Sequence, residues 1–108
     1  MLAKKNRLNR QEVNLLKKAK SKVIQGRFFG LVAQFSDDSK FGLIVSNKVV
    51  PGAVKRNQIK RSLYLAIEKN DWKKKGLFLF LAKKEVLKAT KLDLIKEIEE
   101  IKQKIIFD

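Results

Sequence analysis

A helical pattern of apolar and polar positions covers residues 54–70. At 100° per residue, its apolar side chains share one arc of the helix: Ile59, Leu63, Ala66 and Ile67. The adjacent arc is polar and basic, and carries Asn57, Lys60, Arg61 and Tyr64. We therefore expect the first arc to pack against a core and the second to face a partner. Arg56 lies in the first turn, where N–H groups without partners inside the helix favour a bound phosphate.

Capping signals mark the start of two further helices. Asn9 is followed three residues later by Glu12, which predicts a short first helix that ends near residue 19. Thr90 and Asp93 form the same pattern before a closing helix over residues 91–107. Each helix has one apolar face, made of Val13 and Leu16 in the first and of Leu94, Ile98, Ile101 and Ile105 in the last.

Apolar, β-prone runs predict the strands. Residues 28–35 and 41–49 flank the polar segment 36–40, a pattern that predicts a hairpin with a polar turn. Residues 76–83 are apolar on both faces, which is typical of an interior strand. Val23 and Ile24 are expected to add one short strand before this set.

The resulting order of elements is α-β-β-β-α-β-α, which predicts an α+β fold. We expect a small sandwich of a mostly antiparallel sheet with helices. With 108 residues, of which 44% are hydrophobic, the chain can bury one modest core, so residues 1–108 should form a single domain. A helix that connects two parallel strands is right-handed by default, and the sequence does not test that default.

The charge of the chain points to a polyanionic partner. Lys and Arg number 26 against 11 Asp and Glu, which gives a formal charge of +15. The folded chain therefore repels itself and attracts polyanions. Nucleic acid and an anionic membrane surface are the two candidates. The basic residues are interleaved with core-type runs rather than collected on one amphipathic helix, which favours nucleic acid and argues against a membrane.

Catalytic residues are not evident in the sequence. The chain has neither His nor Cys, so two common agents of proton transfer and nucleophilic attack are missing. The acidic residues lack metal-ligand spacing, and the five glycines lie too far apart for a phosphate-binding loop. We expect no active site, no certain metal site and no small-molecule substrate. The apolar runs are too short to span a bilayer, and the first residues lack a signal peptide's apolar core, so we expect a soluble, cytoplasmic protein.

Three segments carry a family resemblance. They are Asn-Arg-Leu at residues 6–8, FGLIVSNKV at residues 41–49 and AVKRNQIKR at residues 53–61. In this order, and with the late apolar strand and closing helix, they resemble the bacterial ribonuclease P protein subunit over nearly the whole chain. The resemblance implies an unusual left-handed βαβ crossover in place of the right-handed default.

The resemblance also implies a function. A protein of this family binds a large catalytic RNA and the 5′ leader of precursor tRNA, and promotes endonucleolytic removal of that leader. The RNA subunit and Mg²⁺ would be the cofactors that perform the hydrolysis, and ribonuclease P RNA and precursor tRNA would be the partners. The protein would then be an accessory subunit of the holoenzyme without an active site of its own. A ribosomal or other structural RNA-binding protein without processing activity is the alternative, because it would share the size and the charge.

The resemblance assigns roles to individual positions. The family usually has a second Arg after the Asn of the helix motif, and Gln58 stands there, so any contact made by that charge is in doubt. The family's first helix also offers aromatic residues to the leader, and this chain has none at those positions. The cleft for the leader would be lined by Val13, by Leu16 or Lys17, and by Phe29 and Leu31. The RNA-binding residues implied by position are Ser46, Lys48, Lys55, Arg56, Asn57, Lys60 and Arg61, with Arg7 and Arg10 near the substrate.

Overall fold

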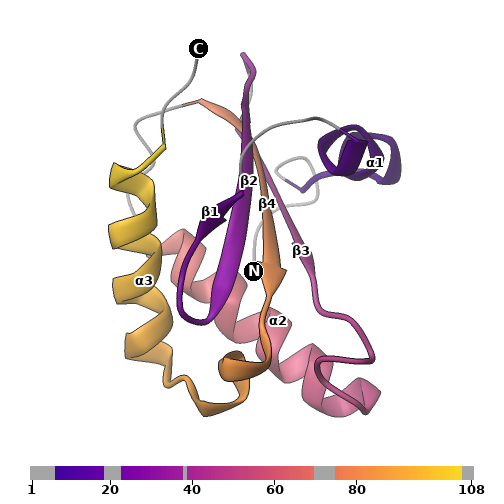
Figure 1. Cartoon of the computed structure of the whole chain (residues 1–108), viewed down its shortest axis with the longest axis vertical. Coiled ribbons are helices and arrows are strands. Elements are labelled where there is room, and N and C mark those ends of the chain that lie inside the picture. Colours follow the sequence, from indigo (N-terminus) through magenta and orange to yellow (C-terminus); the bar gives the residue numbers. More distant parts are fainter. Residues whose placement is uncertain (1–6, 19–22, 38, 70–74, 106–108) are drawn as a thin grey trace.

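The helices and strands occur in the predicted order, with a 3-10 helix added before the last helix (Figure 1). The computed structural model describes residues 7–18, 23–37, 39–69 and 75–105. The predicted ends near residues 19, 70 and 107, and Asn6 of the first family segment, lie outside the described residues. The elements are α1 (Arg10–Lys18), β1 (Ile24–Gln25), β2 (Phe29–Phe35), β3 (Lys40–Ile44), α2 (Ala53–Glu68), β4 (Gly76–Ala82), η2 (Lys84–Lys88) and α3 (Lys91–Gln103).

The strands form one sheet in the order β1-β2-β4-β3. The predicted hairpin between residues 28–35 and 41–49 is wrong, because β4 lies between β2 and β3 and pairs antiparallel with the former and parallel with the latter. The polar segment between β2 and β3 therefore connects two strands that are not neighbours. The reason is the apolar character of β4 on both faces, which is best buried at the centre of the sheet. The hairpin in the structure joins β1 to β2, where the Gly26 N–H donates to the Phe29 carbonyl at 3.0 Å.

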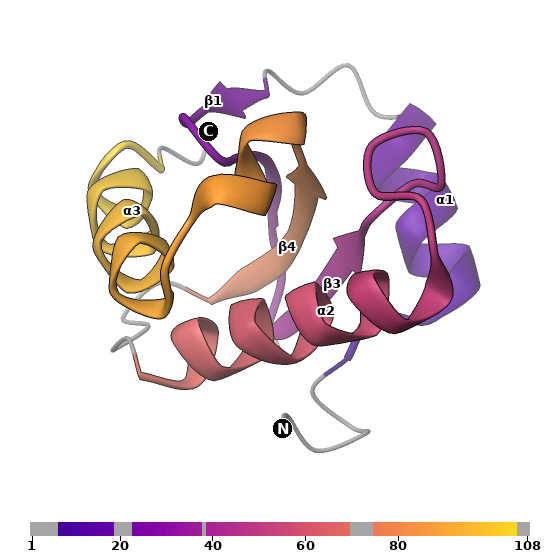
Figure 2. The same ribbon diagram turned by 90° about the horizontal axis from the view of Figure 1, so that it is seen from below.

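The connection from β3 through α2 to β4 is a left-handed crossover. Both strands run downward in Figure 1, with β4 to the left of β3. Figure 2 looks from below and shows α2 on the side that is the back of the first view. When the strands are turned to point upward, β4 lies to the right of β3 and α2 lies behind the sheet. A right-handed unit with β4 on the right would have its helix in front, so this crossover is left-handed. The handedness thus agrees with the family resemblance and not with the generic default.

Helices cover both faces of the sheet, and the alternation along β4 serves both layers. Phe78 and Phe80 enter the larger apolar cluster, which contains the buried side chains of α2 and α3. Leu79 enters a smaller cluster with Leu16 of α1, and Leu77 and Leu81 pack against that cluster. Successive side chains of a strand point to opposite faces, so one apolar run supplies two cores.

Buried Glu97 of α3 ties that helix to the β1–β2 hairpin. Its side chain accepts hydrogen bonds from the backbone N–H groups of Arg27, Phe28 and Phe29, and the residue is 7% exposed. Lys83 adds a bond from its Nζ to the carbonyl of Gly26 at 2.7 Å. Three successive N–H groups of the hairpin therefore have their acceptor on a residue about 70 positions away.

Candidate RNA-binding surface

The loop between β3 and α2 is held by Ser46. The predicted strand over residues 41–49 ends at Ile44, and the chain turns instead. The Val49 N–H donates to the Ser46 carbonyl at 3.1 Å and to its Oγ at 3.2 Å, and the Val50 N–H donates to the same carbonyl at 2.9 Å. Ser46 thus shapes a turn that presents Lys48 to solvent.

Arg56 braces this loop against the start of α2. Its Nη1 donates to the Asn47 Oδ1 at 2.7 Å and to the Val50 carbonyl at 3.1 Å. The side chain is half-buried, unlike those of Lys48, Lys55 and Asn57, which are exposed. The sequence assigned Arg56 to RNA contact alone, whereas the structure gives its guanidinium a role in holding the loop.

The first turn of α2 lacks the side-chain capping seen in α1 and α3. Asn9 and Glu12 exchange two hydrogen bonds at the start of α1, and Thr90 and Asp93 do the same at the start of α3, as predicted. The N-cap of α2 is Gly52, which has no side chain and adopts a φ of 94°, a conformation that favours glycine. Its first turn contains no acid and instead carries Lys55 and Arg56. The positive end of the helix dipole is therefore reinforced rather than neutralised.

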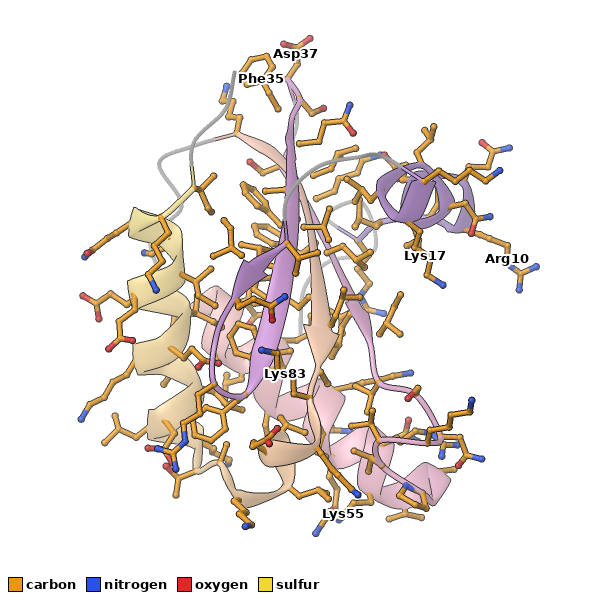
Figure 3. All side chains as sticks on the ribbon, viewed as in Figure 1. Arg10, Lys17, Phe35, Asp37, Lys55 and Lys83 are labelled. Atoms are coloured by element: carbon orange, nitrogen blue, oxygen red, sulfur yellow. The ribbon has the colours of Figure 1, made fainter. Side chains whose placement is uncertain are left out.

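The two predicted arcs of α2 are confirmed by burial. The apolar side chains Ile59, Leu63, Ala66 and Ile67 are all buried in the larger cluster. On the adjacent arc, Asn57 and Arg61 are exposed, and Lys60 and Tyr64 are half-buried. We call the exposed and half-exposed polar residues of this region the α2 basic surface: Lys48, Lys55, Arg56, Asn57, Lys60 and Arg61. Figure 3 shows Lys55 projecting from the lower end of the molecule.

The charge is distributed unequally between the two long helices. In α2, four basic residues (Lys55, Arg56, Lys60, Arg61) face one acid, Glu68, for a net +3. In α3, three lysines face Asp93, Glu97, Glu99 and Glu100, for a net −1. A polyanion is therefore attracted to the α2 side of the molecule more than to the α3 side.

The basic residues near the N-terminus divide between two places. Arg7 pairs with Phe41 through a parallel backbone bridge, and its guanidinium carbon lies 5.4 Å from the centre of the Tyr64 ring on α2. Arg10 and Lys17 are exposed and project from α1 (Figure 3). Of these three residues, Arg7 is the one with a side-chain contact to α2.

The residues predicted to line a leader cleft do not share one surface. Phe29 and Leu31 are fully buried in the larger cluster, on the face of the sheet away from α1, so that part of the prediction is wrong. Leu16 is 1% exposed and belongs to the smaller cluster, against which Val13 packs. Besides Val13, the residues of the α1 face that keep partial exposure are Leu8, Ile44, Leu77 and Leu81, none of which the sequence reasoning assigned to the cleft. The strand alternation along residues 77–81 was the signal that could have identified two of them.

The acidic residues and the helices in the described part of the chain bear on metal binding and on membrane crossing. No group of three or more acidic residues comes together there in a way that could hold a metal ion. Within the same residues, no helix has the length and apolar character needed to cross a membrane.

Comparisons with known proteins agree with the fold and the sequence motifs. The sequence model of the Ribonuclease P family matches residues 2–106. The RNase P protein of Staphylococcus aureus has a similar structure, with a TM-score of 0.78 and 21% identity over 95% of this chain and 98% of that one. The RNase P protein from Thermotoga maritima is similar as well, with a TM-score of 0.78 and 21% identity over 93% of this chain and 97% of that one. Structural similarity at 21% identity shows that the fold is shared. A search among curated protein sequences found no match.

Proposed function

The chain belongs to the Ribonuclease P family and is a protein subunit for 5′ processing of tRNA, and we propose that it binds the catalytic RNA through the α2 basic surface. The observation that supports this assignment is the combination of an uncapped, acid-free first turn with the four basic residues of α2. Phosphate oxygens would accept from the first-turn N–H groups and from the guanidinium and ammonium groups beside them. The alternative of a ribosomal RNA-binding protein is not favoured, because the family match extends over nearly the whole chain.

We assign the chemical step to the RNA subunit and Mg²⁺. The chain has no His or Cys that could act as an acid, base or nucleophile at neutral pH. Mg²⁺ prefers several oxygen ligands in octahedral geometry, and the described residues bring no such acidic cluster together. The metal would therefore be held mainly by RNA, and the protein would supply affinity and orientation. As in other bacterial members of the family, this action would take place in the cytoplasm.

Contact with the precursor tRNA is assigned to the N-terminal side of the molecule. Arg10 and Lys17 are exposed on α1 and can approach the phosphates of a leader, while Arg7 lies beside α2. Val13 and the half-exposed Leu77 and Leu81 offer apolar contact on the same face of the sheet. Leu16 is too deeply buried for such a contact, and packs α1 onto the sheet.

RNA binding of this kind depends steeply on salt. Each phosphate neutralised by Lys or Arg releases a condensed counterion, so affinity falls as salt rises. With about six phosphates neutralised, affinity should fall about a thousandfold between roughly 50 and 200 mM monovalent salt.

The test is a titration of the cognate RNA with point variants of α2. Asn57→Ala and Arg61→Ala should each weaken binding by roughly 1 to 3 kcal/mol, because a hydrogen bond to a charged group is lost. Lys96→Ala on α3 is the matched control, since it also removes one positive charge from an exposed helix position. If Lys96→Ala weakened binding as much as Arg61→Ala, the α2 basic surface would not be the binding site.

A further inference from the structure

The backbone next to Arg7 directs its side chain toward α2. Arg7 forms the parallel bridge with Phe41, and the Leu8 N–H donates to the Phe41 carbonyl at 2.9 Å. This short segment therefore extends the sheet beyond β3, and its successive side chains point to opposite faces. Leu8 packs against the smaller cluster under α1. It lies so close to Gly42 that a Cβ added to this glycine would be 2.7 Å from the Cδ1 of Leu8. Arg7 consequently points to the other face, on which α2 lies.

Tyr64 provides a fixed ring for the Arg7 guanidinium. The ring is half-buried and packs against the larger cluster, so the core holds its position from below. The guanidinium carbon lies 5.4 Å from the ring centre, within the range of a cation–π contact. Burial raises the pKa of Tyr64 above its usual 10.0, while the charge of Arg7 acts in the opposite direction. The hydroxyl is therefore protonated at neutral pH, and the ring interacts with Arg7 through its π face.

The position of Tyr64 along α2 brings Arg7 next to the α2 basic surface. Lys60 and Arg61 precede Tyr64 by four and three residues, which places them beside it on the helix. We propose that Tyr64 is a positioning residue that holds the guanidinium of Arg7 beside Lys60 and Arg61, so that all three contact the phosphate backbone of one bound RNA. This inference rests on the proposed function, and adds to it a cation delivered from a separate element of the fold.

The experiment compares four variants in titrations of the cognate RNA at several salt concentrations: Arg7→Ala, Tyr64→Leu, Tyr64→Phe and the double variant Arg7→Ala/Tyr64→Leu. Arg7→Ala should lower affinity about tenfold and reduce the slope of log affinity against log salt by about 0.7 to 0.9, the loss of one phosphate contact. Tyr64→Leu should reproduce both effects, because the guanidinium loses its platform. The double variant should be no worse than either single one, and Tyr64→Phe should bind like the wild type.

Several results would overturn the inference. These are an unchanged salt slope in Tyr64→Leu, additive losses in the double variant, or an equal loss in Tyr64→Phe. If Tyr64→Leu does not fold, the proton NMR spectrum of the wild type decides instead, since a ring over the guanidinium must shift the Arg7 δ protons upfield, and an unshifted signal contradicts the contact. Loss of affinity in Arg61→Ala without any loss in Arg7→Ala would refute this inference and leave the proposed function standing.

Discussion

Replacing Glu97 by Gln tests how the β1–β2 hairpin is attached to the rest of the protein. The carboxylate accepts from three successive backbone N–H groups, and both of its oxygens accept from Phe28, at 3.1 and 2.9 Å. Gln keeps the shape of the side chain but has only one acceptor oxygen. Its NH₂ group would then face N–H donors of the hairpin, so buried donors lose their acceptor.

The expected destabilisation follows from these bonds. A hydrogen bond to a charged group contributes about 1.5 to 3 kcal/mol, and an unsatisfied buried donor costs about 1 to 3 kcal/mol. These terms overlap, because the same N–H groups enter both. We therefore expect Glu97→Gln to lower the free energy of unfolding by about 2 to 3 kcal/mol, a large part of the stability of a small domain.

Urea denaturation followed by circular dichroism, in a buffer with sulfate, measures this loss. Glu100→Gln is the matched control, because it lies on the same helix, is exposed and makes the same charge change. Both variants leave 10 acids against 26 bases, a formal charge of +16, so general electrostatic repulsion cancels in the comparison. Glu100→Gln should stay within about 0.5 kcal/mol of the wild type. A loss in Glu97→Gln as small as that of the control would refute the role of the carboxylate as the anchor of the hairpin.

Two further predictions concern pH and anions. The pKa of Glu12 lies below its ordinary 4.5, because its carboxylate accepts from the backbone N–H of Asn9 and lies 3.1 Å from the ammonium of Lys40. The ionised carboxylate therefore stabilises the folded state above pH 4.5, and this contribution is lost as the pH falls through the lowered pKa. Stability should thus decline more in the wild type than in Glu12→Gln when unfolding is measured from pH 5 downward, and parallel curves would contradict this. Sulfate should raise the melting temperature more than chloride does at equal ionic strength, because an anion that binds the folded state stabilises it. The free energy of unfolding rises by about 2.7 kcal/mol when the anion concentration is about 100 times its dissociation constant. Equal melting temperatures would mean that screening alone is at work.

Local sequence signals predicted the parts of the fold that local physics determines. The two capping boxes at Asn9 and Thr90 were identified correctly, because each requires only residues three positions apart. The buried arc of α2 followed from apolar periodicity, and the interior position of β4 followed from a run that is apolar on both faces. The pairing of the strands did not follow, since adjacent runs with a polar turn between them favour a hairpin by default, and only the competition for the centre of the sheet excludes it.

For the candidate site, the structure shows where the predicted residues lie, and their roles toward RNA stay a prediction. Asn57 and Arg61 are exposed as expected, whereas Arg56 also braces the loop before α2. Phe29 was assigned to a surface but is buried, because its face of the strand depends on where α1 packs. The contacts of Glu97 with the hairpin and of Arg7 with Tyr64 join residues more than 50 positions apart, and no local pattern announces them.

Reconstituted cleavage of precursor tRNA tests the central claim most directly, namely that the protein contributes binding through the α2 basic surface and no chemistry. The measurement compares the cognate RNA subunit alone, the wild-type protein alone, and the RNA with wild type or with the Lys60→Ala/Arg61→Ala variant, at low Mg²⁺ and limiting protein. We expect no cleavage by the protein alone, accurate 5′ maturation with RNA and wild type, and a strong loss with the variant that higher protein concentration restores. Cleavage by nuclease-free protein without RNA, or full activity of the variant at limiting concentration, would contradict the account.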